Sequence, residues 1–513
     1  MSDLPPELLD ANTPSDVHVT DVAAPPVNDP TLGLPLGAAG ADRSMASGDA
    51  AHRLVTIGDS LTHGVSSGAV FHTTLSWPAQ VAAALGIEDF AVPSYGGPLD
   101  GLPFNIEALV RQIGDAYGDD ISLFEKLSAP LVLHAIVDDN EDYWERGAGA
   151  DPPPSDVRYH NLGIYGWDVR DALSVTDARA AAAAGERQRD DLFGVKPDAD
   201  NDIAAHSVLA PFGIDATQVG AAEWLGANGG IDTLIVALGA NNALDSVVSK
   251  SVVWSDDGYD DLDRKGRYSV WRPTHFAQEY GQLVARLKAI DARRVVLATV
   301  PHVTIAPIAK GVNPERPNEK WRDGSRYFPY YTDPWVAEDD FRPTKHRHIT
   351  HQQARAIDSA IDQYNVTITI TDAVRHARGD GRDWLVVDLC GLLDSLATRR
   401  FVADEAAMDR NGVEPYELPA PIAHLDTQRF RSDENGRSQG GLFSLDTIHP
   451  TVSAYGIVAK SVIDVLDAAG VPAEPVDFAA VLAADSLNSD PPALVDDIFG
   501  LIAPFAKRFV SRT

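Results

Sequence analysis

The chain is poor in cysteine and in positive charge, and it has no long apolar run. Cys390 is the single cysteine among 513 residues, so no disulfide can form within the chain. It stands in an apolar run, and we expect it to be buried. Lys and Arg total 42 against 75 Asp and Glu, a net charge of −33. Since phosphate contacts need a basic surface, this charge excludes a general nucleic-acid binder.

Segments typical of membrane insertion or export are also missing. No run approaches the roughly 18 apolar residues of a membrane span, so we expect no integral membrane association. The acidic, proline-rich start MSDLPPELLDANTPSD lacks the basic and apolar regions of a secretory signal. We therefore expect a cytoplasmic protein, with secretion by another route left open. Residues 1–50 lack periodicity and are expected to form an irregular lead-in. The oligomeric state is left undetermined.

Five short apolar runs follow, and they predict strands buried on both faces of a parallel sheet. The segments between them, such as WPAQVAAALG and FAQEYGQLVARLKAI, have helical spacing. This alternation indicates an α/β fold, a doubly wound, mostly parallel five-stranded sheet between helices. The predicted strands are HRLVTIGDS from His52, RYHNLGIYG from Arg158, DTLIVALGANN from Asp232, RRVVLATVP from Arg293 and WLVVDL from Trp384.

The spacing of these runs predicts one domain over residues 51–465 with large insertions. Structureless loops of such length are improbable, so residues 97–155 and 304–440 are expected to be folded insertions, and 466–513 a helical extension. Aromatic side chains in the insertions are predicted to line an apolar pocket. The alternative is that they form the insertions' own small cores. These aromatics are Phe104, Trp144, Tyr327, Phe328, Tyr330, Tyr331 and Trp335.

Chemically suggestive residues stand at the ends of the predicted strands and near the last helix. Ser60 ends the first strand in GDS, where it serves either as a helix cap or as a nucleophile. Gly166 and Asn241 end the next two runs, and both residue types supply donors to an oxyanion. Asp446 stands three residues before His449, so one turn can present an acid and a base together. Ligands in such sheets bind beyond the carboxyl ends of the strands, where GDS, GIYG and GANN fall.

Four blocks, GDSLTHG, NLGIYG, GANN and DTIHP, resemble in content and order the SGNH, or GDSL, hydrolase family. The resemblance implies a carboxylic ester hydrolase, an esterase or lipase, that works through an acyl-enzyme. It implies that Ser60 is the nucleophile, His449 the base and Asp446 its orienting acid. The implied oxyanion donors are the backbone N–H groups of Ser60 and Gly166 and the side-chain amide of Asn241. In this family, Asp usually stands at the position that Asn242 occupies here. This difference bears on the rigidity expected of the local turn and not on the expected catalysis.

Several alternatives remain beside this prediction. His346, His348 and His351 in TKHRHITH suggest a metal cluster, but no carboxylate or cysteine accompanies them, and a solvated basic loop is the preferred interpretation. The predicted chemistry needs neither a metal nor an organic cofactor, and its partner is a small-molecule or lipid ester. An O-deacetylase acting on acetylated carbohydrate, or a catalytically silent binding protein on the same fold, is the alternative function.

Overall fold

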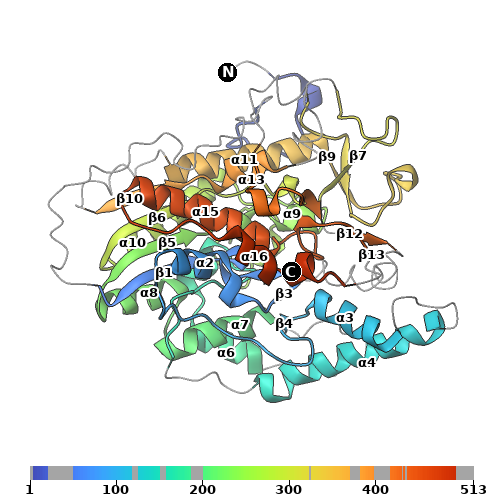
Figure 1. The fold of residues 1–513 in the computed structure, drawn as a ribbon. Helices are drawn as coiled ribbons and strands as arrows, with labels where there is room; N and C mark the ends of the chain where they lie inside the picture. Colours follow the sequence, from blue (N-terminus) through green and yellow to red (C-terminus); the bar gives the residue numbers. More distant parts are fainter. Residues whose placement is uncertain are drawn as a thin grey trace.

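A central parallel sheet organises the chain (Figure 1). The computed structural model describes residues 4–20, 50–117, 125–150, 157–185, 200–322, 325–369, 382–397, 416–429, 431–433 and 436–492. In this part of the chain the main sheet has four strands in the order β1-β5-β6-β10, and every pairing is parallel. The strands are β1 (His52–Gly58), β5 (Ile231–Ala237), β6 (Ala292–Ala298) and β10 (Asp383–Val387). Four of the five predicted strands are thus confirmed.

The run from Arg158 differs from the prediction of a full strand. It lies along the free edge of β1, where Thr56 N donates to His160 O at 2.9 Å and Leu162 N to Thr56 O at 2.8 Å. Ile164 N also donates to Gly58 O at 3.1 Å, but the segment forms an isolated parallel bridge, between Thr56 and Asn161, rather than a continuous ladder with β1. The chain then turns at Gly166 and enters α5 (Val169–Ser174). An edge segment with one neighbour and a turn so close keeps too few ladder bonds to extend as a strand.

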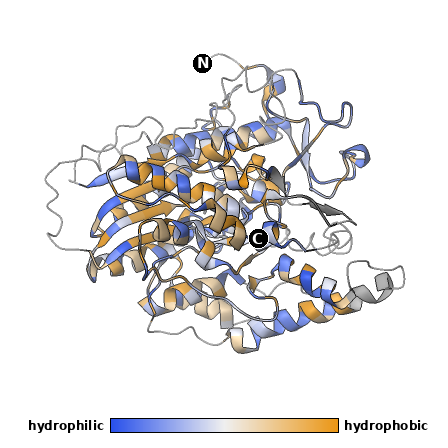
Figure 2. Cartoon of the chain, in the orientation of Figure 1, coloured by the Kyte–Doolittle hydropathy of each residue, from blue (hydrophilic) through white to orange (hydrophobic). Residues whose placement is uncertain are grey.

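Helices cover both faces of the sheet because alternate side chains of each strand point to opposite sides. Val55, Val236 and Val295 pack against one helical layer, and Leu54, Ile235 and Val296 against the other. Figure 2 shows the largely apolar strands between helices that carry both hydrophobic and hydrophilic residues. The first layer includes α5, α8 (Gln218–Ala227), α10 (Pro273–Leu287) and α11 (His351–Thr369), and the second α2 (Trp77–Ala84), α13 (Leu389–Ser395) and α15 (Val452–Ala468).

Helices and strands lie within both predicted insertions, but residues 304–440 also contain α11, β10 and α13, which belong to the central sheet and its helical layers. The first holds α3 (Ile106–Tyr117) packed on α4 (Glu125–Glu145), and it is followed by α6 (Asp177–Gly185) packed on α7 (Asp200–Leu209). One three-stranded sheet joins β2 (Val65–Ser66) and β3 (Ala69–Val70), which precede the first insertion, to β4 (Leu102–Pro103) inside it. The other lies within the second insertion and consists of β7 (Lys310–Val312), β8 (Tyr330–Thr332) and β9 (His348–Thr350). Near the last motif lie β11 (Asp426–Arg429), β12 (Arg431–Asp433), β13 (Gly436–Gln439) and β14 (Gly441–Phe443).

The two ends of the described chain pack onto this body. Leu8 is fully buried and Asp16 pairs with Arg272 at 2.9 Å, so residues 4–20 are anchored, while 21–49 lie outside the described residues. The C-terminal extension is helical in α16 (Phe478–Ala484) and α17 (Ser486–Ser489), and residues 493–513 lie outside the described ranges. Among the described helices, none has the length and apolar character needed to cross a membrane.

Candidate active site

Ser60 begins a short helix directly after the first sheet strand. The helix α1 (Ser60–His63) is capped by Asp59, whose carboxylate accepts from Leu61 N at 3.1 Å. The turn is tight, since a Cβ on Gly58 would lie 2.0 Å from Thr62 Oγ1. Burial raises the pKa of Asp59 to about 6, although the Leu61 N–H and the charge of His449 act against it. The Gly-Asp-Ser motif thus places Ser60 at the carboxyl end of β1, with Asp59 holding the turn.

Asp446 and His449 form a hydrogen-bonded pair on one turn. His449 Nδ1 lies 2.8 Å from Asp446 Oδ2, which also accepts from Gly68 N at 2.7 Å. The other oxygen, Oδ1, accepts from the backbone N–H groups of Ile448 and His449, both at 2.8 Å. Burial alone would raise the pKa of the Asp446 carboxyl, but the charge of His449 and these hydrogen bonds outweigh it and hold the pKa below its usual value. Asp446 therefore stays ionised and fixes the orientation of the imidazole.

Ser60 and His449 line one pocket, whose cavity volume is about 80 Å³. Its walls come from the turn after β5, the segment after β6, α13, β14 and α15, so segments far apart in sequence meet there. Apart from Ser60, His302 and His449, all the lining residues are apolar: Leu61, Ala240, Leu244, Pro301, Val303, Ile305, Ala306, Leu393, Leu396, Leu442, Phe443, Ile448, Pro450, Ala454, Ile457 and Val458. An apolar pocket of this kind suits an apolar group beside the serine.

None of the insertion aromatics predicted to line an apolar pocket lines this one. Tyr327, Phe328 and Tyr331 are buried in the core shared with α11, and Tyr327 OH donates to Asp358 at 2.9 Å. Tyr330 contacts Phe341 and His348, while Trp144 packs in a separate cluster with Tyr95. Their prediction as a pocket lining is wrong for this pocket, because aliphatic side chains from the segments flanking the sheet reach it instead.

The predicted oxyanion donors Gly166 and Asn241 lie next to one another, although neither lines the pocket. Asn241 Nδ2 donates to Trp167 O at 2.9 Å, which engages one of its two hydrogens and orients the other. Asn241 follows Ala240, which does line the pocket. Gly166 has a φ of +75°, and a Cβ there would lie 2.0 Å from Asn201 Nδ2. Glycine is thus required at this turn.

Asn242, which stands where the family usually has Asp, is fully buried. Its Oδ1 accepts from Val169 N at a long 3.4 Å, and its Nδ2 has no hydrogen-bond partner among the described residues. The backbone carbonyl of Asn242 accepts from Trp271 N at 2.8 Å. The asparagine therefore still ties its turn to α5, but more weakly than a carboxylate would.

His63 supports the site and was missed by the sequence reasoning, although it stands inside GDSLTHG. It is fully buried, and burial lowers its pKa to about 3, so the ring is neutral. Nδ1 accepts from Tyr165 N at 3.3 Å, which leaves Nε2 to donate to Tyr95 OH at 3.0 Å. The ring stacks on Tyr165. His63 thus couples α1 to the turn that carries Gly166.

Two further residues contribute to the site, and their sequence context indicates this role only weakly or not at all. His302 lines the pocket and follows β6, so the rule that sites gather at the carboxyl ends of strands points to it. Gly68, the backbone donor to Asp446, lies in a hairpin turn with no chemical signal in its sequence. Only the packing of that hairpin against the last motif reveals its contact.

The histidine cluster is not assembled as a ligand set. His346 Nδ1 accepts from Arg342 N at 3.0 Å, His348 Nδ1 lies 2.9 Å from His346 O, and His351 stacks on Trp321. Among the described residues, no group of three or more His, Cys, Asp or Glu is placed to hold a metal ion. Cys390 is buried as expected, and burial raises its pKa to about 11.

The geometry therefore brings Ser60, His449 and Asp446 into one site at the carboxyl edge of the sheet, with Gly166 and Asn241 beside each other at the same edge. In comparisons with known proteins, no family model and no curated protein matches the chain.

Proposed function

We propose that the chain is a serine hydrolase of the SGNH, or GDSL, type that cleaves carboxylic esters. The observation that carries the proposal is the joint placement of Ser60 and His449 on one apolar pocket, with Asp446 held on the far nitrogen of His449 at 2.8 Å. A serine hydroxyl becomes an effective nucleophile when an oriented imidazole takes its proton. The edge segment from His160 to Ile164 supplies the position of a fifth strand beside β1, consistent with a doubly wound, flavodoxin-like order.

The proposed reaction has two steps. Ser60 Oγ bonds to the ester carbonyl carbon while His449 Nε2 takes the hydroxyl proton, and that proton then passes to the departing alcohol. Water next adds to the acyl carbon while His449 takes one of its protons; the bond from the acyl carbon to Ser60 Oγ then breaks, His449 returns the proton to Ser60 Oγ, and the acid leaves. The negative oxygen formed in each step is stabilised by the N–H groups of Ser60 and Gly166 and by the Asn241 amide.

The pocket lining favours an acyl chain over a sugar. Its apolar walls offer few partners to sugar hydroxyls, whose burial without hydrogen bonds costs free energy. An O-deacetylase would hold only an acetyl group in this pocket and would therefore need less of its apolar wall. A catalytically silent binding protein would not need the hydrogen-bonded Asp446–His449 pair.

The test is hydrolysis of activated esters of graded acyl length and of acetylated sugars by the purified chain. We expect turnover of the esters, and Ser60→Ala should lower kcat by about 10⁴-fold or more, since triad members act as a unit. The matched control is Ser207→Ala, which removes a hydroxyl bonded to its own helix at Ile203 O. Wild-type turnover in Ser60→Ala, with the control unaffected, contradicts the proposed role of Ser60. Turnover of acetylated sugars alone moves the assignment to an O-deacetylase.

A further inference from the structure

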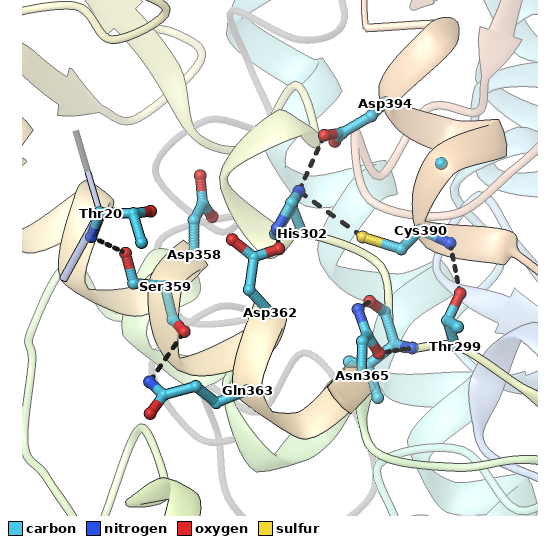
Figure 3. Close-up of polar contacts among 12 residues, drawn as sticks. Thr20, Thr299, His302, Asp358, Ser359, Asp362, Gln363, Asn365, Cys390 and Asp394 are labelled. Atoms are coloured by element: carbon cyan, nitrogen blue, oxygen red, sulfur yellow. Dashed lines mark hydrogen bonds and ion pairs between the residues drawn. The ribbon is translucent and has the colours of Figure 1, made fainter. Parts of the chain in front are cut away.

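His302 occupies an unusual position on the wall of the pocket. It follows β6, and its side chain is 2 % exposed. Nδ1 lies 2.8 Å from Asp394 Oδ2 on α13, and Nε2 lies 3.0 Å from Asp362 Oδ1 on α11 (Figure 3). The ring is thus held between two helices from opposite layers of the sheet, while it also lines the pocket with Ser60 and His449.

The charges around His302 hold it as an imidazolium. Both ring nitrogens face carboxylates, and both must carry a hydrogen to satisfy them. Burial alone would lower the pKa of His302, but the carboxylates of Asp394, Asp358 and Asp362 outweigh it and raise the pKa well above its ordinary value. The groups facing the ring from each packed element are Asp394 and Cys390 on α13, Asp358 and Asp362 on α11, and Arg326, whose Nη1 lies 3.6 Å from Asp394 Oδ2.

The segment that carries His302 also supplies much of the pocket wall. Pro301, Val303, Ile305 and Ala306 line the pocket from this segment, and Leu393, adjacent to Asp394, lines it from α13. Hydrogen bonds to α11 tether the same segment on both sides of His302. Val300 exchanges two hydrogen bonds with Asn365, and Thr304 Oγ1 donates to Asp358.

We propose that His302, clamped between Asp394 and Asp362, is a positioning residue that sets the shape of the apolar wall and thereby the preference of the site for longer acyl chains. The inference rests on the proposed ester hydrolysis. The clamp contacts neither Ser60 Oγ nor the Asp446–His449 hydrogen bond, so its loss changes how the acyl chain is held rather than the transfer of the proton. Because a single methylene in an apolar pocket changes discrimination by about tenfold or more, a small shift of this wall is measurable.

The experiment compares steady-state kcat and KM for activated acetyl and hexanoyl esters in two variants. His302→Gln keeps one polar contact but removes the charge, whereas Asp362→Asn releases one side of the clamp at a carboxylate that is 27 % exposed. The matched control is His206→Gln. In the wild type, His206 Nδ1 on α7 lies 2.7 Å from Asp177 Oδ1 on α6, and the substitution breaks this histidine–aspartate pair. Folding of each variant is checked by circular dichroism and by its urea midpoint.

We expect the hexanoyl-to-acetyl ratio of kcat/KM to fall about tenfold in both variants, through a higher KM for the hexanoyl ester, and to stay unchanged in the control. A ratio within about twofold of wild type in both folded variants overturns the inference. Failure of both variants to fold also overturns it, since His302 would then serve folding as a whole. If the wild type hydrolyses neither ester, or Ser60→Ala keeps its turnover, the proposed function fails instead.

Discussion

Replacing Asp446 with asparagine tests the orientation of the base most directly. The carboxylate accepts from two backbone N–H groups through Oδ1 and from Gly68 N and His449 Nδ1 through Oδ2. Asparagine has one side-chain oxygen, and it accepts more hydrogen bonds at the Oδ1 position, where Ser444 Oγ also donates at 3.3 Å. Its NH₂ group then faces the Gly68 N–H and the Nδ1 of His449. The imidazole must give up the proton on Nδ1 and carry it on Nε2, the atom that should receive the proton of Ser60.

The magnitude follows from this change of tautomer. We expect kcat to fall about 10⁴-fold, which corresponds to roughly 5–6 kcal/mol of activation free energy. The Gly68 N–H loses its acceptor, and this costs about 1–3 kcal/mol of unfolding free energy. Because the pKa of Asp446 is lowered in the folded state, its ionised form stabilises the wild type above the usual aspartate pKa, and this contribution is lost as the pH falls through the folded-state value. The variant should lack this part of the acid dependence in urea unfolding.

The assay is release of a chromophoric alcohol from an activated short-chain ester at pH 7, with unfolding followed in urea. Asp485→Asn is the matched control, since Asp485 is buried and accepts from Ser453 N at 2.8 Å and Asn488 Nδ2 at 2.9 Å, but has no bond to His449. It should be destabilised while kcat stays within about twofold of wild type. If Asp446→Asn keeps kcat within about tenfold of wild type, the orienting role is refuted.

Three further predictions concern the same site. Asn241→Ala should lower kcat by about 10²–10³-fold with little change in KM, because an oxyanion donor acts on the transition state; Asn228→Ala, which removes a similar amide bond to Trp224 O, is the kinetic control, and equal effects would contradict the assignment. Gly166→Ala should lower the urea-derived stability by roughly 1–3 kcal/mol through its φ of +75°, and Asn201→Ala added to it should relieve the clash but not the backbone strain; unchanged stability would show that the turn tolerates a side chain. Prolonged chelation should leave the rate of ester hydrolysis unchanged, as no proposed step uses a Lewis acid; a loss that zinc or calcium restores would contradict this.

Local patterns determined the parts of this protein that depend on short stretches of chain. The runs ending at Gly58, Ala237, Ala298 and Val387 form sheet strands because β-branched and leucine side chains suit a site buried on both faces. The helices over Trp77–Ala84 and Pro273–Leu287 follow from apolar spacing. The three-residue spacing of Asp446 and His449 likewise produced their hydrogen bond, since both lie on one turn.

Features that require distant segments of the chain to meet were decided by the tertiary structure. The run NLGIYG has strand-like composition, yet it lies at an edge and turns at once, so it forms one bridge. The insertion aromatics bury their surface in the nearest core, as Tyr327 does beside Asp358, and leave the pocket to aliphatic residues after β6 and on α13 and α15. The contacts of Gly68 with Asp446 and of His302 with two helices also join far-separated residues. A sequence pattern reports which face of an element is apolar, whereas the packing of the whole chain selects the neighbour that covers it.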